Sequence, residues 1–244
     1  SVRTLYSYLD QGLFTARNID LKRKVHFKPR KCHKTQITDR AVFSNRLYHD
    51  FCSLALTDYV QMDTVHSSRE SKKTLLTMFF TKEKLFLAFL MNRCTKGAVR
   101  LVFDRLEKRM GTYEFASVFE YILTDRGSEF GDPDALETGV NGIQRSSIYY
   151  CDPMQSGQKG GLEQAHTMLR MILPKGTCFE FLTQWDINLI VSHINSTPRE
   201  SLGGRTPYSV ALETLGEEVL NAFQLRPIAP DEVNLTPKLI RFNH

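Results

Sequence analysis

Apolar residues change their spacing along the chain, and these changes predict the order of its elements. Five runs rich in apolar residues are typical of β-strands, at 59–66, 73–80, 84–91, 119–124 and 147–151. Helices are expected where apolar residues recur every three or four positions, at 1–11, 39–56, 95–110, 159–172, 183–194, from 206 and near 219–223, with a short helical piece at 133–137. Three hairpin-linked strands followed by alternating helices and strands predict an α/β fold, a mixed five-stranded sheet flanked by helices.

The same pattern divides the chain into four segments. Residues 1–21 form a small helical segment that resembles the second helix of a helix-turn-helix, so we expect a remnant of a DNA-binding region; an ordinary surface helix is the alternative. A linker at 22–38, a core at 39–215 and a tail at 216–244 follow. The core is long enough to bury a substantial apolar interior.

Positive charge is concentrated near the beginning of the chain. The net charge is +5, yet residues 1–50 hold eleven Lys and Arg against four Asp and Glu. The segment 22–34 has no acid, and Pro29 argues against a continuous helix there. A basic arm of this kind can track phosphates, which predicts DNA contacts from Lys22, Arg23, Lys24, Lys28, Arg30 and Lys31; a solvated tether with no specific role is the alternative.

Other features exclude several classes of protein. No run reaches the ~18 apolar residues of a membrane span, and no signal peptide is recognisable. Five scattered cysteines without a CxxC pair indicate neither a zinc knuckle nor a disulfide framework. Reduced thiols fit a cytoplasmic protein.

Three acids occupy positions that suit metal chemistry. Asp63 lies inside the first predicted strand, Asp125 ends the fourth, and Glu163 lies on the helix after the fifth. In a mixed sheet the first and fourth strands can be neighbours, which would place two carboxylates side by side. A divalent cation relieves their repulsion, and carboxylate oxygens favour Mg²⁺ or Mn²⁺. We rank the loop acids Glu129, Asp132 and Asp152 lower, since loop acids are common.

The helix that carries Glu163 has a second polar stripe. Lys159, His166 and Arg170 recur at helical spacing on the same face as Glu163, opposite an apolar stripe that begins at Leu162. An isolated helix with such a face is usually solvated. Beside two further carboxylates, the three basic side chains become candidates for DNA or phosphate contacts.

These motifs together resemble a known family. The matching pieces are Met62-Asp63-Thr64-Val65, Leu123 to Phe130 (LTDRGSEF), Cys151-Asp152-Pro153, Lys159-Gly160 with Glu163, Leu173 to Thr177 (LPKGT), Asn195, Pro198-Arg199, Leu202-Gly203 and Thr206-Pro207. The chain resembles the DDE transposases of the bacterial insertion-sequence-thirty family, which have a retroviral-integrase-like catalytic core with a ribonuclease-H-like fold. There are 61 residues between Asp63 and Asp125 and 37 residues between Asp125 and Glu163, and these spacings suit that family. His166 departs from it, since the family commonly has Asn there.

The resemblance implies a function, a cofactor and partners. It implies a DDE-type polynucleotidyl transferase with Asp63, Asp125 and Glu163 as catalytic metal ligands for Mg²⁺ or Mn²⁺, with two ions expected. The reaction would be cleavage of a DNA strand at an insertion-sequence end, then strand transfer to target DNA. The expected partners are double-stranded DNA and further copies of the chain, in a bacterial cytoplasm at the nucleoid.

Two alternatives to this function stay open. The basic N-terminal segment also fits a catalytically silent DNA-binding or assembly module. The three acids also fit a nuclease of the same fold that stops after hydrolysis.

Overall fold

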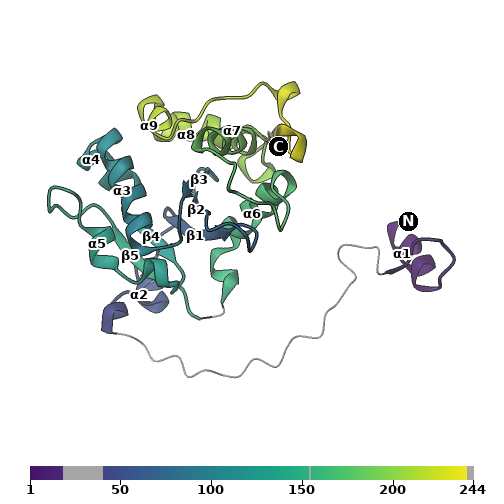
Figure 1. The fold of residues 1–244 in the computed structure, drawn as a ribbon, viewed down its shortest axis with the longest axis horizontal. Coiled ribbons are helices and arrows are strands. Elements are labelled where there is room, and N and C mark those ends of the chain that lie inside the picture. Colours follow the sequence, from purple (N-terminus) through teal and green to yellow (C-terminus); the bar gives the residue numbers. More distant parts are fainter. Residues whose placement is uncertain (19–40, 154, 241–244) are drawn as a thin grey trace. The chain divides into compact units, whose positions relative to one another are not determined.

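The computed structural model describes residues 1–18, 41–153 and 155–240, and the chain divides into two units, Ser1–Thr38 and Asp39–His244. The described part of the first unit holds helix α1 (Val2–Asp10; Figure 1). The helix begins where the Ser1 hydroxyl accepts a hydrogen bond from the Thr4 amide. The role of residues 1–21 as a helix-turn-helix remnant stays a prediction. The basic residues predicted to contact DNA at 22–31 lie outside the described residues.

The second unit is built on a five-stranded sheet. Its strands are β1 (Val60–His66), β2 (Thr74–Phe80), β3 (Phe86–Met91), β4 (Tyr121–Thr124) and β5 (Ser147–Tyr150). Their order is β3-β2-β1-β4-β5. The first three strands pair antiparallel, whereas β1 with β4 and β4 with β5 are parallel. With helices on both faces, this topology is the ribonuclease-H-like fold, so the predicted fold class is confirmed.

Helices cover both faces of this sheet. The described helices of the second unit are α2 (Tyr48–Ser53), α3 (Lys96–Met110), α4 (Thr112–Val118), α5 (Pro133–Glu137), α6 (Gly160–Ile172), α7 (Gln184–Asn195), α8 (Pro207–Thr214) and α9 (Glu217–Ala222). Neighbouring residues of a strand point to opposite faces. Phe80 packs on Phe119 at the end of α4, with ring centroids 5.5 Å apart, and Phe79 packs against Gly161 of α6. Therefore α4 and α6 lie on opposite faces.

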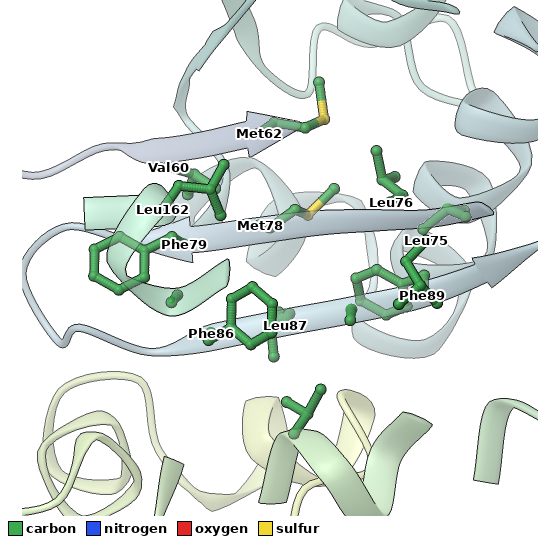
Figure 2. Packing of buried hydrophobic residues seen from close by; sticks show 14 of the residues in the cluster. Val60, Met62, Leu75, Leu76, Met78, Phe79, Phe86, Leu87, Phe89 and Leu162 are labelled. Atoms are coloured by element: carbon green, nitrogen blue, oxygen red, sulfur yellow. The ribbon is translucent and has the colours of Figure 1, made fainter. Parts of the chain in front are cut away.

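The apolar core follows the three antiparallel strands. Every residue of β2 is buried, which explains why its sequence is nearly continuously apolar instead of alternating. Figure 2 shows apolar side chains of β1, β2 and β3, with Leu162 of α6 lying near Val60 and Phe79. The core therefore joins the helix that carries Glu163 to the strand that carries Asp63.

Two amide side chains of α7 cover the free edge of β3. Gln184 accepts a hydrogen bond from the Leu90 amide (2.7 Å) and donates to the Ala88 carbonyl (3.1 Å). Three turns further on, Asn195 accepts from the Phe86 amide (2.9 Å) and donates to its carbonyl (2.7 Å). These bonds satisfy the outward-facing backbone groups of an edge strand that would otherwise pair with another chain.

The structure corrects the prediction of one helix over 39–56. Residues Ala41–Phe43 form a 3₁₀ turn, and α2 begins only at Tyr48. Between them the backbone carbonyl of Arg46 accepts a hydrogen bond from the Tyr150 amide (2.8 Å), and Leu47 forms a parallel β-bridge to Tyr150. The segment is extended there because it pairs with the edge of β5. Helix α4 was not predicted; Gly111 ends α3 at φ +87°, and a new helix starts directly after it.

No helix within the described ranges is long and apolar enough to cross a membrane. Four cysteines that the structure describes, Cys52, Cys94, Cys151 and Cys178, are free thiols.

A buried arginine joins α3 to the loop between β4 and β5. The side chain of Arg145 is fully buried, and its Nη1 lies 2.7 Å from both Asp104 and Glu107 of α3. Its Nε donates to the Leu136 carbonyl (2.8 Å), and its guanidinium lies over the ring of Phe103. All its strong interactions are made inside the protein, so nothing in solvent could replace them.

Replacing Arg145 with Met should destabilise the fold strongly. The change leaves the nearly buried Glu107 without its cation, which costs about 3–5 kcal/mol. Urea unfolding of the wild type and the variant measures this loss. Arg205→Met is the matched control, because the Arg205–Glu213 pair is exposed and should cost at most about 1 kcal/mol. Equal losses in the two variants would contradict the role of Arg145.

The tail after α9 is attached to α7 through its backbone amides. The amides of Arg226 and Ile228 donate to Ser192 and Ser196, at 3.3 and 3.0 Å. The amide of Asn234 donates to Nδ1 of the buried His193 at 3.1 Å. Nδ1 can accept this bond only when it carries no proton. Burial lowers the pKa of His193 from its ordinary value, and Arg226 lowers it further, so the neutral ring is favoured.

The depressed pKa of His193 predicts that this contact weakens in acid. Between the folded pKa and the unfolded value of about 6.5, the unfolded chain binds more protons than the folded chain. The contribution of His193 to stability is therefore present above about pH 6.5 and lost as the pH falls towards the folded pKa. Urea unfolding at pH 7.5 and pH 5.5 should show a smaller drop in stability for His193→Gln than for the wild type. An identical drop would exclude this assignment.

Candidate active site between two parallel strands

The parallel pairing of β1 with β4 places two of the predicted acids side by side. Asp63 lies in β1, and Asp125 follows Thr124, the last residue of β4. The Thr124 hydroxyl donates to the carbonyl of Met62 (3.1 Å), which ties the two strands together beside the acids. The two carboxylates therefore lie close together on neighbouring strands in the middle of the sheet, an arrangement that the sequence allowed.

Lys159 lies between these carboxylates. Its Nζ is 3.0 Å from Oδ2 of Asp63 and 3.4 Å from Oδ2 of Asp125, and it donates to the Met62 carbonyl at 3.3 Å. Only 6% of the Lys159 side chain is exposed, against 26% for Asp63 and 46% for Asp125. The buried ammonium thus reduces the repulsion between the two acids.

Each acid uses its other oxygen for a nearby backbone amide. Oδ1 of Asp63 accepts from Thr64 (2.7 Å), and Oδ1 of Asp125 accepts from Gly127 (2.9 Å). These local bonds fix the orientation of both carboxylates and leave the two Oδ2 atoms facing the same cation.

Glu163 lies one helical turn after Lys159 on α6, and its carboxylate is exposed. Within the described ranges, no group of three His, Cys, Asp or Glu side chains is arranged to hold a metal ion. The structure brings Asp63 and Asp125 together and places Glu163 on the adjoining helix. The donor set of two fixed carboxylates with a third on a neighbouring turn still suits a hard divalent ion such as Mg²⁺ or Mn²⁺. Completing the ligand shell would require the exposed Glu163 side chain to turn towards the pair.

Glu129, which we ranked below the three acids from the sequence, lies directly beside Asp63 and Asp125. The hydroxyl of Thr64 donates to Glu129 at 2.7 Å, so the residue after Asp63 is linked to the loop after Asp125. A side chain at Gly127 would start within 3 Å of both Glu129 and Asp125. The TDRG turn therefore needs glycine, because two carboxylates already fill the space. The other two loop acids have local roles: Asp132 caps α5, and Asp152 bonds Gln158.

His166 faces the sheet beneath Asp63. Its Nε2 lies 2.8 Å from the hydroxyl of Thr77, and that hydroxyl donates to the carbonyl of Asp63 at 3.0 Å. Since the Thr77 hydroxyl donates its hydrogen to the Asp63 carbonyl, it accepts the second bond, so Nε2 of His166 carries a hydrogen and is the donor. Burial lowers the pKa of His166, which favours the neutral ring. The geometry gives His166 a bracing contact with β2, and its predicted contact with DNA stays a prediction.

Arg170 lies at the other end of the same helix face. Its guanidinium is half-buried and donates to the carbonyls of His66 and Leu173, both at 3.4 Å. These long bonds hold Arg170 against the end of β1. Its predicted phosphate contact also stays a prediction.

An open groove of about 540 Å³ begins where β1 ends. It is lined by His66, Ser67, Ser68, Arg69, Ser71, Lys72, Thr74, Arg93, Cys94 and Thr95. No acid lines it, and three exposed cations do. Within the described part of the chain, Arg69, Lys72 and Arg93 form no salt bridge. The sequence does not reveal this groove, because its cations come from two loops that only the sheet brings together.

Cys94 connects the groove to the acidic pair. Its thiol lies next to Glu129 and Thr64, and burial together with the negative Glu129 raises its pKa to about 11. The groove therefore adjoins the Thr64–Glu129 bond that flanks Asp63 and Asp125.

Comparison with known proteins relates the chain to mobile-element enzymes. No family model matches it. It is 32% identical over 88 residues to transposase InsI of insertion sequence element IS30A from Escherichia coli, covering 35% of this chain and 21% of that protein. It is 34% identical over 100 residues to the transposase of insertion sequence element IS1086 from Cupriavidus metallidurans, covering 41% and 28%. The chain thus matches less than a third of either relative. Over these segments it is distantly homologous to transposases of the IS30 type, as the sequence motifs predicted.

Two solved structures of similar arrangement are retroviral. The catalytic core domain of BIV integrase gives a TM-score of 0.44 at 23% identity, covering 65% of this chain and 96% of that chain. The HTLV-2 integrase catalytic core domain, solved in complex with magnesium, gives a TM-score of 0.44 at 16% identity, covering 63% and 95%.

The close approach of α6 to the sheet predicts that a side chain at position 161 destabilises the fold. A methyl group there would lie 2.4 Å from the Phe79 ring, which is closer than any packed contact. Gly161→Ala should therefore push out the start of α6 and cost about 1–3 kcal/mol in urea unfolding. Gly160→Ala is the matched control, because nothing lies within 4 Å of a side chain there. Equal stability of the two variants would contradict this close packing.

Proposed function

We propose that the chain is the catalytic core of a DDE-type transposase that cleaves DNA at the ends of a mobile element and joins those ends to target DNA. The observation that carries this proposal is a pair of carboxylates on neighbouring parallel strands that face one cation: Asp63 in the middle of β1 and Asp125 directly after β4. The distant homology to insertion-sequence transposases supports the same reaction.

The acids would hold the metal ions of this reaction. Asp63 and Asp125 present their Oδ2 atoms to a common point, and Glu163 would complete the ligands from α6. When bound, Mg²⁺ or Mn²⁺ ions supply charge neutralisation and activation of the attacking oxygen in an in-line phosphoryl displacement. The hydrogen bonds to Thr64 and Gly127 keep the two carboxylates oriented throughout.

Both chemical steps transfer a phosphoryl group at this one place. In the first, water attacks a phosphodiester, and the bond to the 3′ oxygen breaks to leave a free 3′-hydroxyl. In the second, that hydroxyl attacks a target phosphodiester and takes the place of its 3′ oxygen. The protein supplies position and charge in each step, which accounts for most of the catalysis in phosphoryl transfer.

The groove of Arg69, Lys72 and Arg93 would hold the DNA backbone. Its cations are exposed and face no acid along the groove, so they are free to pair with phosphates. Arg170, beside His66 at the same end of β1, would extend this surface towards the carboxylates. Copies of the chain would assemble on the two ends of one element, since strand transfer requires both.

Substitution of the three acids tests the catalytic assignment. Asp63→Asn, Asp125→Asn and Glu163→Gln should each lower Mn²⁺-dependent cleavage by at least about 10²- to 10³-fold, because each removes a charge that stabilises the transition state. The substrate is DNA flanking the gene that encodes the chain, and circular dichroism checks the fold. Asp132→Asn is the control, as Asp132 only caps α5. Full activity of any of the three variants would remove that residue from the site.

A second substrate separates a transposase from a nuclease of the same fold. A DNA end already cut to expose its 3′-hydroxyl should be joined to target DNA by the wild type and not by the three variants. Hydrolysis without any joined product would favour the nuclease. Sequence-independent binding with neither product would favour a DNA-binding module.

Charge removal in the groove tests the DNA surface. Arg69→Gln combined with Arg93→Gln should make the plot of log affinity against log salt concentration shallower by about 2, since each phosphate contact contributes about 0.9. Fluorescence anisotropy with duplex DNA measures the slope. Arg105→Gln combined with Lys108→Gln removes the same charge from the exposed face of α3 and should leave the slope unchanged. The same slope in both double variants would exclude the groove.

A further inference from the structure

Lys159 is held by the two acids and by the backbone next to Asp63. Its three contacts are Oδ2 of Asp63, Oδ2 of Asp125 and the carbonyl of Met62, the residue before Asp63. It is buried, and it stands at the last position of the 3₁₀ turn Ser156–Lys159, just before α6. A lysine placed only to contact DNA would extend into solvent instead.

A metal ion shared by the two acids needs the space that this ammonium fills. Mg²⁺ binds carboxylate oxygens at about 2.1 Å, and the two Oδ2 atoms that would bind it are those that contact Lys159. A divalent ion and an ammonium group in the same gap would repel each other strongly in a partly buried site. Lys159 must therefore move before the pair can share a metal.

The surroundings of Lys159 allow it to leave at low cost. Its flexible four-carbon side chain can swing without moving α6. The Met62 carbonyl keeps a partner when Lys159 departs, because the Thr124 hydroxyl also donates to it. The start of α6 stays attached to the sheet through the Leu162 amide, which donates to Gln61 at 2.9 Å.

We propose that Lys159 is an exchangeable counter-ion of the active site. It holds Asp63 and Asp125 together before metal binds, and the metal displaces it so that its ammonium can pair with a DNA phosphate. This inference rests on the proposed function, since it assumes that the acidic pair binds metal. It predicts that the chain lowers its own metal affinity with an internal competitor.

Removal of the competitor tests the proposal. Mn²⁺ binding is measured by titration calorimetry on the full chain, without DNA. In Lys159→Gln the dissociation constant for Mn²⁺ should fall on the order of tenfold, because the site no longer spends most of its time closed by the lysine. Lys108→Gln removes one exposed charge from α3 and should leave the constant unchanged. An unchanged or weaker affinity in Lys159→Gln overturns the proposal.

A second measurement uses the wild-type chain, so it does not depend on whether the variant folds. Reductive methylation followed by peptide mass spectrometry reports how accessible each lysine is. Methylation of Lys159 should be slow without metal and should rise several-fold at saturating Mg²⁺, whereas methylation of Lys108 should not change. If the rate at Lys159 is unchanged at saturating Mg²⁺, the lysine does not leave and the inference is wrong.

Asp63→Asn separates this inference from the proposed function. If the wild type binds Mn²⁺ and Asp63→Asn does not, the metal site stands whatever Lys159 does, and an unchanged affinity in Lys159→Gln then overturns only the counter-ion role. If neither the wild type nor Lys159→Gln binds Mn²⁺, the metal site and the counter-ion role both fail.

Discussion

Two carboxylates held side by side on neighbouring strands of a sheet repel each other, and much of the structure around them serves to keep them there. The parallel pairing of β1 with β4 fixes their backbones, and bonds from Thr64 and Gly127 fix their orientation. Lys159 supplies the charge that makes the arrangement tolerable. A fold that accepts this cost retains a place where a divalent cation can act, which is why the acidic pair carries the functional assignment.

Helix α6 links the core to the chemistry. One face packs through Gly161 and Leu162 onto β1 and β2, close enough that a single methyl group at Gly161 would collide with Phe79. The other face carries Lys159 at its start, Glu163 one turn later and Arg170 near its end. His166 lies between these faces and reaches the carbonyl of Asp63 through Thr77. The position of Glu163 relative to the acidic pair therefore depends on how tightly the helix is seated.

Sequence periodicity predicted the elements that are set by burial alone. The five strands and helices α3, α6 and α7 follow from apolar spacing, and the adjacency of Asp63 and Asp125 follows from strand order. The sequence did not reveal the features that depend on contacts between distant segments. The helix predicted over 39–56 is interrupted because Arg46 and Leu47 pair with the edge of β5. The location of Lys159 between the acids, and the groove formed from two loops, likewise required the sheet.

In the proposed site, Asp63 and Asp125 share a divalent metal ion that also binds Glu163 and that displaces Lys159. The most direct measurement is the anomalous scattering of Mn²⁺ in crystals of the chain. We expect an anomalous peak at bonding distance from Oδ2 of Asp63 and of Asp125. Glu163 should be turned towards the peak, and the Lys159 side chain should have moved out from between the two carboxylates. A Mn²⁺ peak elsewhere, with Lys159 still between the two carboxylates, would contradict the proposed site.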